Sequence, residues 1–133
     1  MKFSVVIGNP PYSDDEDRGD IKSGNSLYPK FMYIGMIVGE YSCMIVPSGW
    51  MTMNQMSGIK CNELKHLRES SNRISEIHDF HNASDIFEGV TIPTGVCYYL
   101  MSEKESPSCS HFIDGMACEA ERLLYDKDLD VLF

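Results

Sequence analysis

Residues 3–12 read FSVVIGNPPY, and this stretch decides how the rest of the chain is interpreted. Residues 3–7 are mostly apolar and partly β-branched, which predicts a buried strand. The GNPP that follows at residues 8–11 cannot continue a strand and predicts a rigid loop. Open α/β sheets bind their ligands at the carboxyl ends of strands. We therefore expect residues 9–12 to lie at a ligand-binding edge.

The residue types in this loop suit an exocyclic amine. Pro10 and Pro11 have no backbone N–H groups, so the Pro10 carbonyl and its neighbours are available to accept hydrogen bonds from a ligand. The side-chain oxygen of Asn9 is another acceptor beside them. Tyr12 offers a flat face for a base, and such stacking is worth about 1–3 kcal/mol. The alternative interpretation is a tight turn in which Tyr12 caps the core.

Strand and helix patterns alternate along the chain, which predicts an α/β domain with a mainly parallel sheet. Ser26 is a candidate cap for the first helix, whose predicted apolar face consists of Leu27, Phe31, Ile34 and Val38. A short edge strand over residues 111–113 and a helix over residues 116–131 would complete a single domain spanning residues 1–133. The other predicted strands are residues 42–46, 73–80 and 92–101, and the predicted helices are residues 26–39 and 57–69.

Composition narrows the class of protein. The chain has 133 residues, with 11 Lys and Arg against 20 Asp and Glu, and its net charge is −9. Because binding to nucleic acid depends on neutralising phosphates, this chain alone is unsuited to it. The apolar run at residues 31–39 is far too short to span a bilayer. The five cysteines form no CxxC pair and the histidines lack ligand spacing, so no metal site is expected. A reducing cytoplasm is the expected compartment.

The segment VVIGNPPY resembles the catalytic motif of S-adenosylmethionine-dependent amino-group methyltransferases, especially the DNA adenine-N6 enzymes. LYPKFMYIGMIV, CMIVPSGWM and ISEIHDFHNASDIFEGVTIPTGVCYYL resemble later segments of bacterial restriction-modification methylases, particularly the type IIG enzymes that are fused to an endonuclease. The resemblance covers about residues 3–102, leaving residues 103–133 as an edge strand and a C-terminal helix.

This resemblance implies roles for individual residues. Asn9, Pro10, Pro11 and Tyr12 would form the catalytic motif. In it, Asn9 and the Pro10 carbonyl would hold the adenine N6 amine, and Tyr12 would stack on the flipped base. Phe87, from the loop between the third and fourth predicted strands, is the candidate for a second aromatic wall, and an ordinary loop hydrophobe is its alternative. The family binds its cofactor on a glycine-rich loop, yet no two of the ten glycines here stand at GxG spacing. The chain is therefore expected to be a partial Rossmann-like class I methyltransferase sheet, strands four to seven with flanking helices, lacking the cofactor-binding first half.

The resulting hypothesis is the catalytic half of a site-specific DNA (adenine-N6) methyltransferase that uses S-adenosylmethionine and is inactive alone. Its expected partners are DNA, through a separate recognition domain, and either the absent amino-terminal half or a second copy bound at the exposed sheet edge. Two alternatives stay open. One is a non-enzymatic, methylase-like interaction protein that pairs with or mimics a methylase. The other is a fragment with the same chemistry on RNA or on a protein glutamine.

Overall fold

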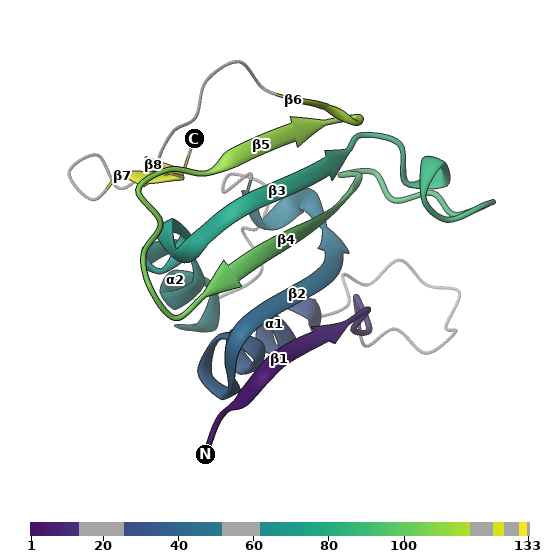
Figure 1. Cartoon of the computed structure of the whole chain (residues 1–133). Coiled ribbons are helices and arrows are strands. Elements are labelled where there is room, and N and C mark those ends of the chain that lie inside the picture. The colour runs from purple at the N-terminus through teal and green to yellow at the C-terminus, as the bar shows by residue number, and fades with distance from the viewer. Residues whose placement is uncertain (14–25, 52–61, 118–123, 127–130, 133) are drawn as a thin grey trace.

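The structure is a computed structural model that describes residues 1–13, 26–51, 62–117, 124–126 and 131–132. Within these residues six strands form one mixed sheet in the order β1-β2-β4-β3-β5-β6 (Figure 1). A separate two-stranded sheet pairs β7 with β8. The strands are β1 (Phe3–Gly8), β2 (Gly39–Pro47), β3 (Ile74–Phe80), β4 (Val96–Ser102), β5 (Ser110–Ile113), β6 (Met116–Ala117), β7 (Tyr125–Asp126) and β8 (Val131–Leu132). The helices are α1 (Tyr28–Val38) and α2 (Asn62–Glu69), with 3-10 turns η1 (Ser48–Met51), η3 (Ser71–Arg73) and η4 (Ala83–Asp85).

The sheet is mixed, whereas the sequence predicts a mainly parallel one. β1 pairs parallel with β2, and β3 pairs parallel with β5. β4 lies between β2 and β3 and is antiparallel to both, so β1, β2, β3 and β5 all run the same way. The strand predicted over residues 92–101 begins only at Val96, because Gly95 adopts φ +70 and turns the chain just before it. The architecture is that of a partial Rossmann-like methyltransferase sheet.

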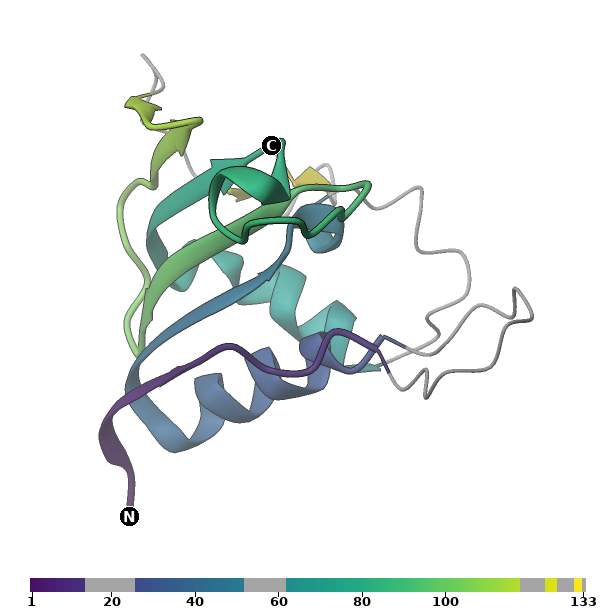
Figure 2. The same ribbon diagram turned by 90° about the vertical axis from the view of Figure 1, so that its right-hand side faces the viewer.

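Both α-helices lie on the same side of the six-stranded sheet (Figures 1 and 2). The buried core fills the space between them and the sheet, and its largest fully buried side chains include Trp50, Tyr99 and Ile77. We call this side of the sheet the covered face. Among the described residues, no helix is long and apolar enough to cross a membrane.

Helix α1 forms where its sequence pattern predicts, but it buries a different side. Phe31 and Ile34 from the predicted apolar face are 38% and 50% exposed, whereas Tyr28, Met32 and Met36 are buried. The cause lies at Gly35, where an added Cβ would stand 2.6 Å from Ser42 Oγ and 2.7 Å from Met44 Cε on β2. The helix turns its glycine towards β2 because only that side permits such a close approach.

The start of α1 also differs from the prediction. Leu27 occupies the cap position, and no side chain caps the helix. Ser26 instead forms an isolated β-bridge with Ser13. Pro29 stands in the first turn, where its fixed φ suits a helix and its missing N–H would have had no helical partner.

The C-terminal region corrects a second prediction. Asp114 and Gly115 have φ values of 49 and 80, and this tight turn folds Met116–Ala117 back against β5 as β6. The edge of the sheet is therefore β6 rather than the strand predicted over residues 111–113. The helix predicted over residues 116–131 is wrong wherever the structure describes this region, since β6, β7 and β8 are extended. The first part of the second predicted helix, residues 57–61, lies outside the described residues.

Candidate functional site

Residues 9–12 leave the sheet at the carboxyl end of β1, as the sequence predicts. Asn9 and Pro11 are exposed, Pro10 is buried, and Tyr12 is half-buried. The loop is fastened to the start of α1, because the Leu27 N–H donates to the Tyr12 carbonyl at 3.0 Å. An anchored loop with an exposed Asn9 amide has the arrangement needed to receive a ligand at this edge.

Tyr12 also makes contact with the core. Its ring meets that of Tyr28 edge-on, with centroids 6.5 Å apart and an interplanar angle of 80°. Its hydroxyl is buried without a hydrogen-bond partner among the described residues. Burial raises the pKa of the Tyr12 phenol, so the group stays neutral and keeps an O–H to donate. Core packing and ligand contact are thus compatible roles for this residue.

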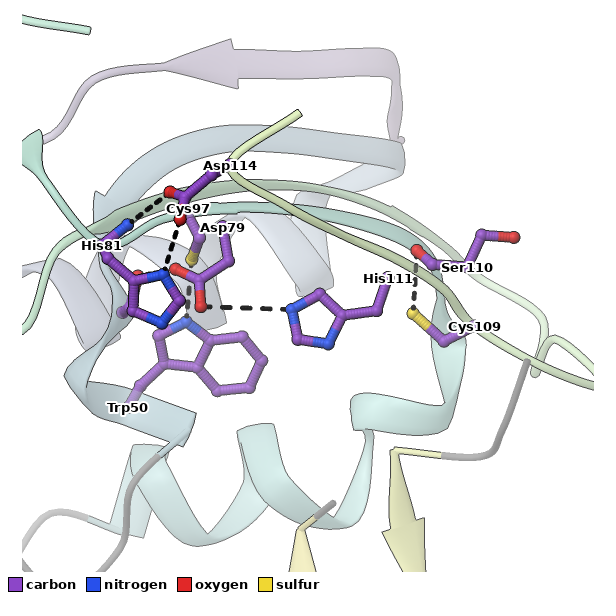
Figure 3. Close-up of polar contacts among 9 residues, drawn as sticks. Trp50, Asp79, His81, Cys97, Cys109, Ser110, His111 and Asp114 are labelled. Carbon is purple, nitrogen blue, oxygen red and sulfur yellow. Dashed lines mark hydrogen bonds and ion pairs between the residues drawn. The ribbon is translucent and has the colours of Figure 1, made fainter. Parts of the chain in front are cut away.

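A second polar group lies at the carboxyl ends of β2 and β3. The Ser48 hydroxyl donates to Asp79 Oδ1 at 2.5 Å. His111 Nε2 lies 4.0 Å from Asp79 Oδ2 (Figure 3). Both partners of the His111–Asp79 pair are largely buried, with side chains 11% and 14% exposed. These contacts join the loop after β2 to β3 and β5.

Trp50 and Cys97 complete the packing beneath these polar contacts. The Trp50 indole N–H donates to Cys97 Sγ at 3.4 Å (Figure 3). Burial raises the pKa of the Cys97 thiol to about 12, so it remains protonated and unreactive near neutral pH. This pair is structural, and it fixes η1 against β4.

An exposed ion pair stands beside this group. His81 Nδ1 lies 2.9 Å from Asp114 Oδ2, and the His81 backbone N–H donates to Asp114 Oδ1 at 3.0 Å (Figure 3). The hydrogen bond to Asp114 raises the pKa of His81, and the same bond lowers the pKa of Asp114. The Asp114 N–H in turn donates to the Asp79 carbonyl at 2.8 Å, so the turn before β6 is tied to the end of β3.

Phe87 lies in the loop between β3 and β4 and is half-buried. Its backbone N–H donates to the Ala83 carbonyl at 2.9 Å. The base of the loop is held to η1, because the Ser48 N–H donates to the Gly95 carbonyl at 3.1 Å. Both the Phe87 loop and residues 9–12 follow carboxyl ends of parallel strands, but among the described residues no ring contact joins Phe87 to Tyr12.

Sequence reasoning missed the Ser48–Asp79 contact. The two residues are 31 positions apart, and neither belongs to a spaced motif. Two local signals were present: Ser48 follows a predicted strand directly after Pro47, and Asp79 is a charged residue near the end of another. Polar residues at the carboxyl ends of neighbouring strands meet at one edge of the sheet, and that rule would have flagged them.

The side chains at the carboxyl edge of the sheet include hydrogen-bond acceptors for an amine, but they do not include the groups that a metal ion or a nucleotide-like cofactor would need. Among the described residues, no three His, Cys, Asp or Glu side chains stand together as a metal site would need. A nucleotide-like cofactor calls for a glycine-rich turn, and the ten glycines provide no GxG spacing. The acceptors and the aromatic ring of residues 9–12 are the binding groups that the sequence predicts for an amine.

Comparison with known proteins identifies a family and a relative. Residues 1–87 match the Eco57I restriction-modification methylase family. An uncharacterized adenine-specific methylase from Mycoplasma pneumoniae is 31% identical over 102 residues, which are 75% of this chain and 24% of that protein. This chain thus spans about a quarter of the length of that relative.

Two solved structures share the fold. A modification subunit from Vibrio vulnificus YJ016 superposes on 99% of this chain with a TM-score of 0.56, at 12% identity and over 29% of its own length. The type I restriction-modification system methyltransferase subunit from Streptococcus thermophilus superposes on 92% with a TM-score of 0.51, also at 12% identity and over 29% of its length. With two thirds of its sequence matched by the family, the chain belongs to the Eco57I restriction-modification methylases.

Proposed function

We propose that this chain is the catalytic half of a DNA (adenine-N6) methyltransferase of a restriction-modification system, with a type IIG-like arrangement. The observation that carries the proposal is the position of Asn9–Pro10–Pro11–Tyr12, which directly follows β1 at the carboxyl edge of the sheet with the Asn9 amide exposed. Family membership and the adenine-specific relative support methyl transfer to adenine. The whole of residues 1–133 would serve as one unit of the enzyme.

The residues of the chain would act on the amine of the base. Asn9 Oδ1 and the Pro10 carbonyl accept its two N–H groups, which turns the nitrogen lone pair towards the methyl donor. These hydrogen bonds strengthen as positive charge develops on nitrogen, so they favour the transition state over the bound substrate. S-adenosylmethionine would supply the methyl group on a sulfonium. No covalent bond to the protein is required.

Tyr12 and Phe87 would hold the base outside the duplex. Extrusion of a base costs a few kcal/mol, and stacking on aromatic side chains offsets this cost. The Tyr12 ring packs edge-on against Tyr28, and the Tyr12 backbone carbonyl accepts from the Leu27 N–H, so the residue is held in place before a base binds. Phe87 stands on the loop between β3 and β4, and the end of this loop is held by the hydrogen bond from the Ser48 N–H to the Gly95 carbonyl. Phe87 could therefore approach the adenine from a different strand end than Tyr12.

The experiment is methyl transfer by a reconstituted enzyme. This chain is combined with the remainder of the M. pneumoniae relative, the part outside its matched segment, and transfer from labelled S-adenosylmethionine to unmethylated DNA is measured. Asn9→Ala should lower the rate by at least about 10²-fold, the usual effect of removing a hydrogen bond made in the transition state. Asn9→Asp, which keeps an acceptor, should retain more activity than Asn9→Ala.

A folding control shows whether a loss of activity in Asn9→Ala comes from the site or from unfolding. The far-UV circular dichroism and the unfolding midpoint of Asn9→Ala should equal those of the wild type, because the side chain is exposed. Full turnover by Asn9→Ala would contradict the assignment. Methyl transfer to RNA or to a glutamine-containing protein, with none to DNA, would support amine methylation but show that DNA is not the substrate.

A further inference from the structure

The loop between β3 and β4, residues 81–95, carries Phe87 and projects beyond the carboxyl end of the sheet (Figure 1). Its first half is held together by its own backbone. The Ala83 carbonyl accepts from the Ile86 N–H at 3.1 Å and from the Phe87 N–H at 2.9 Å, and Ala83 is buried. The position of Phe87 therefore depends on how the two ends of this loop are fastened to the sheet.

The two ends of the Phe87 loop meet at a narrow neck. A Cβ on Gly95 would stand 2.3 Å from the Phe80 carbonyl oxygen and 3.1 Å from the His81 Cα, so the chain leaves β3 and returns to β4 at nearly the same point. The Ser48 N–H donates to the Gly95 carbonyl at 3.1 Å, and the Ser48 hydroxyl donates to Asp79 Oδ1 at 2.5 Å. Because Ser48 is buried, the returning end of the loop is fixed to the core.

The end of the loop that leaves β3 is fastened by Asp114, from the turn between β5 and β6. Asp114 Oδ1 accepts from the His81 backbone N–H at 3.0 Å, and Asp114 Oδ2 lies 2.9 Å from His81 Nδ1 (Figure 3). The Asp114 N–H donates to the Asp79 carbonyl at 2.8 Å. Asp114 thus contacts both the first residue of the loop and the last part of β3.

The backbone of Asp114 indicates that its side chain matters as well as its turn. Its φ is 49, a left-handed conformation that glycine adopts with the least steric strain. The next residue, Gly115, has a φ of 80 and is such a glycine. Aspartate at position 114 therefore accepts strain that glycine would avoid, and it supplies the carboxylate that both His81 groups contact.

We infer that Asp114 is a positioning residue for the proposed methyl transfer, because it holds His81 at the neck of the Phe87 loop and so sets where Phe87 meets the extruded base. Asp114 would act through Phe87 rather than on the base. Tyr12 is held separately, by its contact with Tyr28. The separation of the two aromatic walls would thus depend on the loop. This inference rests on the proposed function, and it adds a residue beyond residues 1–87, the part that matches the family.

The first measurement is amide hydrogen exchange in this chain, followed by mass spectrometry. Asp114→Gly keeps the left-handed turn and removes the carboxylate, so exchange in residues 81–95 should become at least about threefold faster. Asp114→Asn keeps an acceptor for the His81 N–H and tolerates the same φ, so its exchange should lie closer to that of the wild type. Equal exchange in Asp114→Gly and the wild type would overturn the inference, because the turn alone would then hold the loop.

Glu103→Gly is the matched control. The Glu103 and Asp114 side chains are both 43% exposed and both belong to ion pairs, but Glu103 pairs with Lys2 at the amino end of the sheet. Exchange in residues 81–95 should be unchanged in Glu103→Gly. Equally faster exchange of the loop in both variants would indicate a general loss of stability and would also overturn the inference.

The second measurement is a double-mutant cycle on methyl transfer by the reconstituted enzyme. Asp114→Gly should lower kcat/KM for DNA at least about threefold, since small misplacements of a binding group lower the rate. This effect should largely disappear when Phe87 is already replaced by alanine, because Asp114 would act through Phe87. A merely structural role predicts instead that the two effects add, and additive effects would contradict the inference. Asp114→Asn should restore part of the lost activity.

The two measurements separate this inference from the proposed function. If the wild-type enzyme transfers no methyl group to DNA, the proposed function fails, and the exchange of residues 81–95 still decides whether Asp114 fixes the loop. If Asn9→Ala abolishes transfer but Asp114→Gly leaves it unchanged, the proposed function stands and the inference about Asp114 fails.

Discussion

The two faces of the sheet are both apolar, yet they differ in what lies against them. Ile77 and Val46 on the covered face are completely buried. Val5 and Ile7 on the other side of the sheet, which we call the open face, are more than half exposed. The same residue types thus serve two purposes. On the covered face they stabilise this chain, and on the open face they remain exposed. The difference shows that an apolar strand pattern predicts burial without identifying what provides it.

The largest effect should come from the covered face. Ile77→Ala should reduce the free energy of unfolding by about 2–5 kcal/mol, because it removes buried methyl groups and leaves a cavity. Val5→Ala, a similar truncation on the open face, should change it by less than about 0.5 kcal/mol in the isolated chain. Urea denaturation followed by circular dichroism measures both. Equal losses would show that the two faces do not differ in packing.

A smaller effect is expected where the covered face reaches the carboxyl edge. A Cβ on Gly95 would stand 2.3 Å from the Phe80 carbonyl oxygen, and its φ of +70 already disfavours a side chain. Gly95→Ala should cost about 1–3 kcal/mol of unfolding free energy from strain and displacement. Gly89→Ala is the control, since its φ is +74 but a Cβ there meets nothing within 4 Å. Urea denaturation measures both variants. The additional loss of unfolding free energy in Gly95→Ala over Gly89→Ala is the steric contribution.

The smallest effect concerns the exposed pair His81–Asp114. The raised pKa of His81 means that its contribution to stability is full below the ordinary pKa near 6.5 and is lost as pH rises through the folded value. The lowered pKa of Asp114 means that its contribution is lost as pH falls through that value. The pair is therefore strongest in weakly acidic solution. NMR titration of His81 should show its pKa falling towards 6.5 in Asp114→Asn, and an unchanged value would contradict this pairing.

Much of the fold follows from the sequence because its strands are continuous apolar runs bounded by glycine and proline. β1, β2 and β3 were predicted to within three residues at each end. The buried side of α1 was not predictable, because both sides of that helix are apolar and only the approach of Gly35 to β2 distinguishes them. The turn at Asp114 and Gly115 was missed for a related reason. Its left-handed conformations reverse a segment whose apolar residues also fit a helix.

The candidate site also has one part that the sequence predicts and one part that it does not. The location of residues 9–12 at a strand end follows from local sequence, since the strand and the loop are adjacent. The contact between Ser48 and Asp79 depends on the order of strands in the sheet, with antiparallel β4 between β2 and β3. That order is a property of the whole chain, and no short motif encodes it. The role of Phe87 remains a prediction.

Gly39 and Val6 help to set the register of β1 against β2. One side of β1 carries Phe3, Val5 and Ile7 and the other carries Ser4, Val6 and Gly8, so a slip of one residue would exchange the two sets. Gly39 opposes this slip by leaving room for Val6 at a point where a side chain would collide with it. A slip would carry Asn9 about 3.3 Å along the sheet. This displacement is larger than the range of distances over which a hydrogen bond forms. A glycine on the neighbouring strand therefore helps to determine where the Asn9 amide lies.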